Sequence, residues 1–236
     1  MNYSLNLRSL FRPTVSIVTV TLLSGLSLVG CNSNQPTVKT VPATPQIQNS
    51  VTPSNNTSSA TLKNLQAAYN GESNAHARYL AFSQKATDEG YLQVAALFQA
   101  AADAEAIHAA NHGAVIRKLG VTPEAKIETP TVKSTAENLQ EAIKGESYER
   151  HTMYPQFIEQ ARAEGNQDAV VTFTYAIDAE KQHANLYTQA KDNLGQWQEA
   201  KMTFYVCPQC GYTTNTLGFT NCPDCNTAEN LFLSVA

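Results

Sequence analysis

The chain is poor in charged residues and contains no run of lysine and arginine. Charged residues make up 15% of its 236 residues, and the formal net charge is −4. Proteins that hold nucleic acid by its phosphates carry clustered positive charge, so this balance argues against a nucleic-acid partner. Apolar residues make up 42%, enough for a hydrophobic core, and the length allows one or two domains.

The N-terminus lacks an apolar run long enough to span a bilayer, but it has the parts of an export signal. Arg8 and Arg12 precede a mostly apolar stretch over residues 15–29, shorter than the roughly 20 residues that a spanning helix needs. The sequence Leu-Val-Gly-Cys, ending at Cys31, resembles the lipobox of bacterial lipoproteins, which implies cleavage before Cys31 and a lipid on it. We expect residues 1–30 to be a lipoprotein signal peptide; an uncleaved anchor and an ordinary signal peptide are the alternatives.

A lipid on the new N-terminus would place the protein in the cell envelope, anchored to a membrane and facing away from the cytoplasm. The stretch that follows, residues 31–60, consists mainly of Asn, Gln, Ser, Thr and Pro, with Lys39 as its one charged residue. Such a composition buries too little apolar surface to offset the entropy of ordering. We therefore expect a disordered tether.

From residue 61 onward the apolar residues recur with the period of a helix. The predicted helices span residues 61–88, 91–119, 134–163 and 166–194. Turns fall at Gly90 and Gly165, while residues 120–133 are long enough for a crossover along a bundle. Pro155 should kink the third helix. The pattern predicts an all-α four-helix bundle over residues 61–195.

Two repeats of this bundle carry the same set of metal-binding residue types. In each, a lone glutamate precedes a Glu-x-x-His pair by 33 or 34 residues, and a glycine turn lies midway. Positions i and i+3 share one face of a helix, so two hairpins would direct four carboxylates and two imidazoles at one interior point. That is the ligand set of a two-iron carboxylate site. The predicted ligands are Glu72, Glu105 and His108 in the first repeat, and Glu146, Glu180 and His183 in the second.

A single Glu-x-x-His pair usually lies on a solvated surface. Here the residues around the glutamates indicate that the glutamates are buried. Glu105 is flanked by alanines, which suit a closely packed helix interior. Gly71 and Gly145 precede the two lone glutamates, and a mid-helix glycine costs ~1 kcal/mol relative to alanine, so we expect a close approach or a packing role there. Glu149, three residues after Glu146, has no counterpart in the first repeat and makes the site asymmetric.

Four cysteines near the C-terminus form two CxxC pairs, at Cys207, Cys210, Cys222 and Cys225. Paired CxxC motifs favour tetrahedral coordination of zinc or a single iron by four thiolates, and disulfides are the alternative. The surrounding segment, residues 203–236, is too short to hold a core unaided, so a metal is expected to stabilise it.

Together these motifs resemble the rubrerythrin family over residues 61–236. The resemblance rests on Gly-Glu-Ser-Asn-Ala over 71–75, Tyr79, Asp-Glu-Gly-Tyr over 88–91, Gly-Glu-Ser-Tyr-Glu over 145–149, Met-Tyr-Pro over 153–155, both Glu-x-x-His pairs and the cysteine motifs. It implies a ferritin-like bundle whose two non-haem irons reduce hydrogen peroxide to water. It also implies a rubredoxin-like domain over 203–236 whose iron passes single electrons, although zinc remains possible there.

The resemblance further implies roles for individual residues. Glu105 and Glu146 would bridge the irons, Glu72 would be a terminal ligand of one iron, and Glu180 with His183 would be terminal on the other. Glu149 would exchange with His108 as the redox state changes, since ferric iron favours a carboxylate and ferrous iron accepts an imidazole. Tyr79 and Tyr154 match tyrosines that hydrogen-bond the site carboxylates, with core packing as the alternative. The remaining histidines, His76, His112 and His151, match no ligand position and are expected at the surface or behind the ligands.

The family commonly forms dimers in which the tail of one subunit serves the other's diiron site, so a homodimer is expected. An exported member has no access to NADH, and its electron donor is unknown. Two other functions stay open: ferritin-like iron oxidation and storage, and non-catalytic metal binding with zinc in the tail. Glu149 and the cysteine tail argue against storage, because storage needs neither ligand exchange nor an attached electron carrier.

Overall fold

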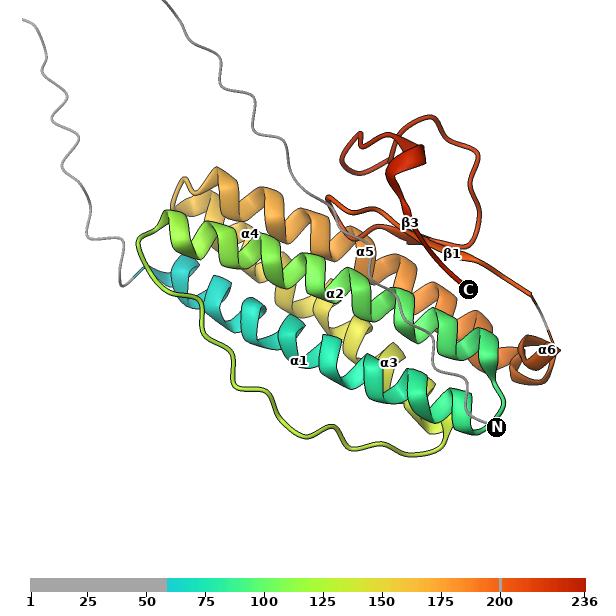
Figure 1. Ribbon diagram of the computed structural model, residues 1–236. Helices are drawn as coiled ribbons and strands as arrows, with labels where there is room; N and C mark the ends of the chain where they lie inside the picture. The colour runs from blue at the N-terminus through green and yellow to red at the C-terminus, as the bar shows by residue number, and fades with distance from the viewer. Residues whose placement is uncertain (1–58, 200) are drawn as a thin grey trace, which may run out of the picture. The chain divides into compact units, whose positions relative to one another are not determined.

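The computed structural model describes residues 59–199 and 201–236; the predicted signal peptide, Cys31 and almost all of the predicted tether lie outside them. The elements of the bundle are α1 (Ala60–Asp88), α2 (Leu92–Lys118), α3 (Thr135–Tyr148), the π-helix η2 (Glu149–Met153), α4 (Tyr154–Ala163) and α5 (Gln167–Asp192) (Figure 1). Because α3, η2 and α4 follow one another without a break, they form the third of four long helical segments. The predicted four-helix fold is confirmed.

Both predicted hairpins turn at a glycine in the left-handed region of backbone space. Gly90 has φ 82° between α1 and α2, and Gly165 has φ 71° between α4 and α5. The starts of α3 and α5 are capped by polar side chains, whereas α2 has no side-chain cap. Ser134 and Glu137 form a capping box at α3, and Asn166 Oδ1 accepts the amide N–H of Ala169 at α5. These local signals set the lengths of the two hairpins.

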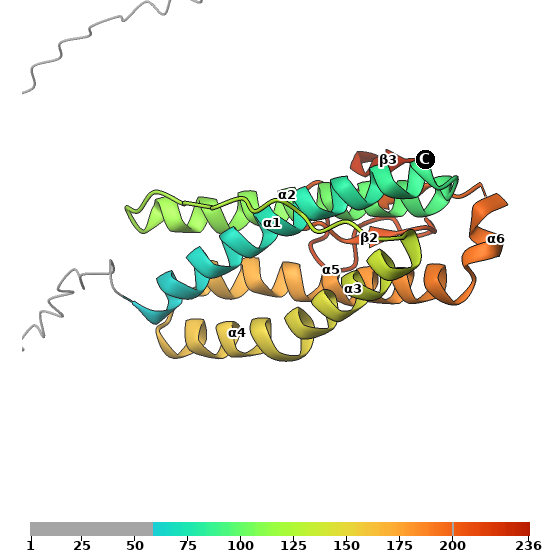
Figure 2. The ribbon, with the colours of Figure 1, turned by 90° about the horizontal axis from the view of Figure 1, so that it is seen from below.

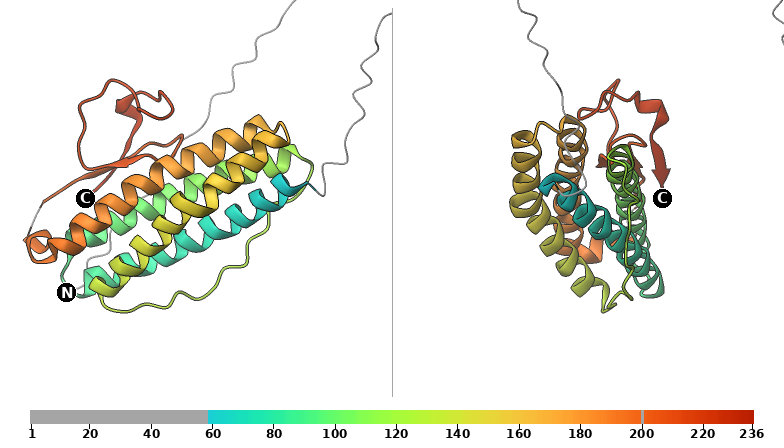
Figure 3. Two further views of the ribbon diagram at one scale, coloured as in Figure 1. Left: turned by 180° about the vertical axis from the view of Figure 1, so that it is seen from behind. Right: turned by 90° about the vertical axis from the view of Figure 1, so that its left-hand side faces the viewer.

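The crossover between the hairpins runs along α1, as predicted, and side-chain amides of α1 hold it there. Asn70 Oδ1 accepts the backbone N–H of Lys126 at 2.8 Å, and Asn74 Oδ1 accepts that of Glu128 at 2.8 Å. One turn earlier, Gln66 donates to the carbonyl of Thr122. Residues spaced by four share one face of a helix, so these amides form a row that pairs with an extended chain. Figure 3 shows the crossover following α1 along the bundle.

The third helical segment bends where the sequence places Pro155, near the start of α4. Proline has no N–H to donate within a helix, and here the amide of Tyr154 bonds the carbonyl of Glu149, five residues back. Such π turns widen a helix locally and often lie at functional sites. Figure 2 shows α3 and α4 meeting at an angle. The predicted kink is therefore a π turn that begins at Glu149.

The buried apolar residues form two main clusters in the bundle. One contains Tyr79, Phe82, Phe98 and Tyr187, with ring centroids 5.1–6.2 Å apart. The other contains Leu65, Ile116, Tyr154 and Phe173. Each cluster contributes a tyrosine, Tyr79 or Tyr154, that donates a hydrogen bond to a buried glutamate. The polar site described below therefore has an apolar, aromatic boundary on both sides.

The C-terminal part, which we call the cysteine unit (residues 203–236), follows the short helix α6 (Leu194–Glu199). Its sheet has the order β2-β1-β3, both pairs antiparallel, with β1 Phe204–Val206, β2 Thr213–Thr214 and β3 Leu233–Val235; η3 (Glu229–Leu231) precedes β3. Phe204 and Val206 are fully buried in the apolar cluster that includes the small side chains of α2. Among the described residues, no helix combines the length and the hydropathy needed to cross a bilayer.

Candidate metal centre

The six predicted bundle ligands lie together in the interior and form two overlapping donor groups. Within each group, one ligand atom from every residue lies within 4.8 Å of the others. The first group is Glu72, Glu105, His108 and Glu180, and the second is Glu105, Glu146, Glu180 and His183. All six side chains are at most 1% exposed. Helices α1, α2, α3 and α5 thus each supply part of one buried site.

Two carboxylates belong to both groups, and this differs from the roles expected from the sequence. Glu105 and Glu180, on the facing helices α2 and α5, are the shared members. Glu146, expected as the second bridging ligand, belongs to one group only. Glu105 and Glu180 are therefore the carboxylates placed to contact both metal positions, whereas Glu72 and Glu146 would each contact one.

The chemistry of these donors fits metal ions. One oxygen each of Glu72, Glu105, Glu146 and Glu180 is buried without a hydrogen-bond partner among the described residues. Burial, reinforced by Glu105, raises the pKa of Glu72 and of Glu180 well above the ordinary value. Buried carboxylates crowded in this way require cations or protons, and oxygen and imidazole donors together suit iron, manganese or zinc.

The cysteine unit orients both ligand histidines. Nδ1 of His108 faces the site, 2.9 Å from Glu105 Oε2, while its Nε2 lies 3.1 Å from the carbonyl oxygen of Cys210. Likewise Nδ1 of His183 faces the site and its Nε2 lies 3.1 Å from Thr213 Oγ1. Since a carbonyl only accepts, Nε2 of His108 carries a proton, and Nδ1 is then available to a metal.

Glu149 lies beside the site but belongs to neither donor group. Glu149 as a whole residue is partly exposed. Burial of its carboxyl group, together with the nearby Glu146, raises its pKa well above the ordinary value. His108, its expected exchange partner, has its ring nitrogen inside the first group. The arrangement is therefore the one in which the imidazole, and not Glu149, faces the metal position.

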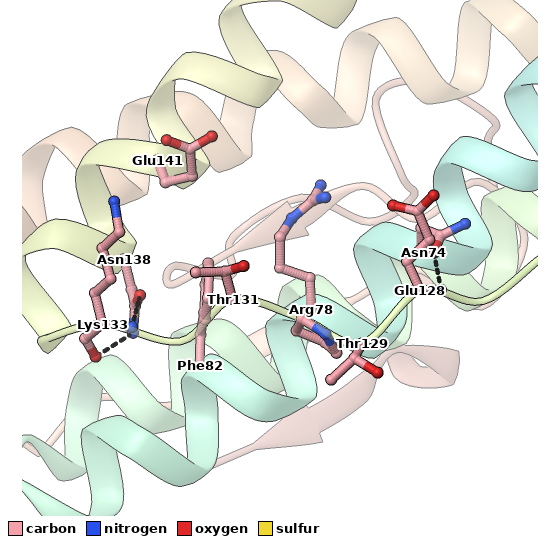
Figure 4. A pocket seen from close by; sticks show the side chains of 10 residues that line it. Asn74, Arg78, Phe82, Glu128, Thr129, Thr131, Lys133, Asn138 and Glu141 are labelled. Atoms are coloured by element: carbon pink, nitrogen blue, oxygen red, sulfur yellow. Dashed lines mark hydrogen bonds between the residues drawn. The ribbon is translucent and has the colours of Figure 1, made fainter.

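Arg78 is a positively charged neighbour of the site that the sequence did not single out. Its guanidinium lies 5.4 Å from the ring centroid of Tyr79. Burial opposes protonation of Arg78, but the nearby Tyr79 and Glu149 outweigh it and raise its pKa. It also lines a pocket of about 330 Å³ between α1, α3 and the crossover, together with Glu128 and Glu141 (Figure 4). In Figure 4 the Arg78 side chain extends from α1 toward α3. No spacing rule marks it, since a single arginine on a helix usually faces solvent.

The two predicted tyrosines hydrogen-bond the site. Tyr79 donates to Glu146 Oε1 and Tyr154 donates to Glu72 Oε1, so each bonds the lone glutamate of the opposite repeat. A third tyrosine was missed: Tyr187 is fully buried, and burial, with the charges of Glu146 and Glu105, raises its pKa. It follows His183 by one helical turn, and that spacing was the signal available in the sequence.

The other histidines lie in different settings. His112 is fully buried behind the ligands, with Nε2 3.1 Å from the hydroxyl of Tyr154. His76 is partly buried and pairs with the carbonyl of Ala102 at 2.7 Å, whereas His151 is exposed. The expectation that they lie at the surface or behind the ligands agrees with these positions.

The packing role expected for the two mid-helix glycines is wrong. A Cβ added at Gly71 or at Gly145 meets no other atom within 4 Å. The close approach occurs instead at Gly211 of the cysteine unit, which has φ 79° and lies against His108 and the carbonyl of Ala104. A side chain at Gly211 would overlap the His108 ring.

The four cysteines of the cysteine unit converge without forming disulfides. Sγ of Cys207 lies 3.4 Å from that of Cys225, and Sγ of Cys210 lies 3.5 Å from that of Cys222. A disulfide bond would be about 2.05 Å, whereas a tetrahedron of ~2.3 Å metal–sulfur bonds separates its sulfurs by roughly 3.8 Å. Hydrogen bonding from Cys210 lowers the pKa of Cys207 to about 4, so a thiolate is available. The geometry fits one metal ion held by four thiolates.

Comparison with known proteins agrees with both sites. Nigerythrin of Nitratidesulfovibrio vulgaris is 40% identical over 178 residues, covering 73% of this chain and 85% of that protein. Rubrerythrin-2 of Clostridium acetobutylicum is 37% identical, covering 71% of this chain and 92% of the relative. The structure of fully reduced, all-ferrous nigerythrin superposes with a TM-score of 0.70 at 36% identity, covering 84% of this chain and 100% of that chain. The family model for rubrerythrin matches residues 63–191, and the chain belongs to the rubrerythrin family.

Proposed function

We propose that the protein is a non-haem diiron peroxidase that reduces hydrogen peroxide to water. One observation carries the proposal: a buried two-metal donor set is hydrogen-bonded, through His108 and the carbonyl of Cys210, to a four-cysteine site. Membership of the rubrerythrin family supports it. The iron-handling alternative is not favoured, because the matching family model and curated relatives are rubrerythrins and nigerythrin.

The side chains that would hold the two irons are Glu72, Glu105, His108, Glu146, Glu180 and His183. When bound, the two ferrous ions would supply the two electrons that split the O–O bond of peroxide. Glu149 would take the place of His108 when the irons become ferric, because an anionic carboxylate binds the higher charge better. Tyr79 and Tyr154 would hold the outer carboxylates in place through their hydrogen bonds.

The cysteine unit would return electrons one at a time. Cys210 is a ligand of the four-thiolate site and its carbonyl accepts from His108, so a short covalent and hydrogen-bonded path joins the two sites. We propose iron in this site, with zinc as the alternative that would make it structural only. The electron donor is unknown, and we propose a homodimer.

The export of the protein is also a proposal. It rests on the N-terminal sequence, in which the four residues ending at Cys31 have the form of a lipobox. Cells expressing the full chain should incorporate a radiolabelled fatty acid into it and hold it in the membrane fraction. The Cys31→Ser variant should lose the label, and labelling of that variant would contradict lipidation at Cys31.

The peroxidase proposal is tested by mixing the reduced, iron-loaded protein with hydrogen peroxide under anaerobic conditions. We expect reoxidation by peroxide to be faster than reoxidation by oxygen at the same concentration, and one peroxide to be consumed per two electrons. Iron content distinguishes storage: about three irons per chain fits two bundle irons and one in the cysteine unit, and tens would indicate storage. Reoxidation no faster than with oxygen would contradict a peroxidase.

A further inference from the structure

A row of hydrogen-bonded side chains runs from a surface pocket to Glu72, with one residue from each of α5, α2, α4 and α1. Thr172 Oγ1 lies 2.9 Å from Nδ1 of His112. His112 Nε2 lies 3.1 Å from the hydroxyl of Tyr154, which in turn donates to Glu72. Thr172 is 5% exposed and the other three residues are at most 1% exposed. The row therefore crosses the apolar interior.

The outer end of the row reaches a pocket of about 240 Å³. Thr172 lines this pocket together with Tyr175 of the same helix and Gln209 of the cysteine unit. Two other threonines of α5, Thr174 and Thr188, donate back to carbonyls of their own helix at 2.7 Å, as helical threonines commonly do. Thr172 pairs with an imidazole instead, so its hydroxyl connects the pocket with the interior.

The chemistry of the inner end sets the direction of every hydrogen bond in the row. As a metal ligand Glu72 is an anion that only accepts, so Tyr154 donates to it. The hydroxyl of Tyr154 has one proton, hence His112 must donate to it through Nε2–H. Nδ1 of the neutral ring then accepts from Thr172. All donors point from the pocket toward the metal centre.

The ring of His112 is suited to pass a proton without keeping one. The ring is fully buried, and each of its nitrogens has one hydrogen-bond partner, Thr172 at Nδ1 and Tyr154 at Nε2. A neutral imidazole accepts at one nitrogen while it donates from the other. Phe173, with its ring centroid 5.3 Å from that of His112, packs beside it.

We propose that Thr172, His112 and Tyr154 conduct protons from the pocket to the metal centre. The inference rests on the proposed function: converting one peroxide into two waters breaks the O–O bond and takes up two electrons from the reduced irons and two protons from solvent. In each transfer Tyr154 gives its hydroxyl proton to an oxygen of the cleaved peroxide beside Glu72. His112 then donates its Nε2 proton to Tyr154 and takes up the hydroxyl proton of Thr172 at Nδ1. Solvent in the pocket restores the proton of Thr172. Before the next transfer the ring regains its first tautomer when Nδ1 returns a proton to solvent through Thr172 and Nε2 takes one up from solvent as the ring turns, so the reset adds no net proton.

The path can be tested without turnover in the full chain loaded with zinc, which is redox-inert. Nuclear magnetic resonance of ring-labelled histidine measures how fast the Nε2 proton of His112 exchanges with water. Thr172→Val removes the hydroxyl at the pocket and should slow this exchange at least about tenfold, while Thr172→Ser keeps it and should exchange within about twofold of the wild type. Equal exchange in both variants would overturn the path.

Measuring peroxide reduction distinguishes proton conduction through His112 from a role in which His112 only positions Tyr154. His112→Gln can donate to Tyr154 through its amide N–H and accept from Thr172 through its carbonyl, but an amide does not relay protons readily. We expect this variant to keep the thermal stability and the ferric absorption spectrum of the wild type, while peroxide reduction falls about tenfold or more with a larger solvent deuterium effect. A wild-type rate in His112→Gln would show that the row only positions Tyr154.

Failure of the proposed function would look different. If the wild type does not reduce peroxide, the peroxidase proposal fails, yet the exchange of the His112 proton still tests the path. If zinc does not bind the bundle, the metal site itself is contradicted, and with it both proposals.

Discussion

The Nε2 nitrogen of His108 lies 3.1 Å from the carbonyl oxygen of Cys210, so a ring that faces the bundle site is hydrogen-bonded to a cysteine of the other metal site. The two residues are 102 positions apart in sequence. Their contact requires the cysteine unit to lie directly on α2, and Gly211 is the residue that permits it, because any side chain there would meet the His108 ring.

Gly211→Ala should therefore damage the bundle site from outside it. We expect a loss of about 1–2 kcal/mol from the left-handed backbone and a further ~1–3 kcal/mol from overlap with His108. The measurement is urea unfolding together with iron content. Gly120→Ala is the matched control, because Gly120 has the same φ of 79° and open space around its Cβ position. Equal losses in the two variants would contradict the contact.

At the mid-helix glycines beside the ligands, replacement by alanine should stabilise the protein, in contrast to the replacement at Gly211. Gly71 lies within α1, and a Cβ there would meet no atom within 4 Å. Gly71→Ala should raise the free energy of unfolding by about 1 kcal/mol, because alanine loses less backbone entropy in a helix. In the control Gly113→Ala, the new Cβ would lie 3.2 Å from the Tyr69 ring, so the gain should be smaller or reversed. A loss of stability in Gly71→Ala would restore a packing role.

The two site tyrosines should affect metal binding more than folding. Tyr79→Phe removes the donor to Glu146, and Tyr154→Phe removes the donor to Glu72. Partners that hold metal ligands are commonly worth 10–100-fold in affinity, so competition with a chelator should show a loss of about that size in each variant. Tyr148→Phe, at an exposed tyrosine of α3, is the control and should bind iron as the wild type does. If all three variants bound iron with the affinity of the wild type, Tyr79 and Tyr154 would only pack in the core and would not hold the metal ligands.

Much of this site could be predicted from the sequence because helical spacing carries it. The two Glu-x-x-His pairs and the hairpin glycines fix which side chains share a level of the bundle, and the structure brings those side chains together. The sharing of Glu180 between both donor groups could not be predicted, since it depends on how α2 and α5 face each other. The same holds for Thr172 and His112, which meet only after four helices have packed.

The junction between the hairpins makes stability depend on acid pH. Glu89 accepts the backbone N–H of Thr135 at the start of α3 at 2.8 Å and pairs with Lys85. Hydrogen bonding from Thr135, with the pairing to Lys85, lowers the pKa of Glu89 from 4.5 to about 2. Since the folded pKa lies below the unfolded one, this stabilisation is present above about pH 4.5 and is lost as the pH falls toward 2. Glu89→Gln should be less stable than the wild type at pH 7.

The difference between Glu89→Gln and the wild type should shrink as the pH falls through this window, which chemical unfolding at several pH values can follow. Glu124→Gln, in the exposed crossover, is the control and should change stability little at any of these values. A pH-independent difference at Glu89 would contradict the role of its charge.

The most direct measurement is anomalous X-ray scattering at the iron absorption edge from crystals of the iron-loaded full chain. We predict two peaks roughly 3.5–4 Å apart among the carboxylates of Glu72, Glu105, Glu146 and Glu180, and a third among the four cysteines. A single peak in the bundle, or none, would contradict a two-metal centre.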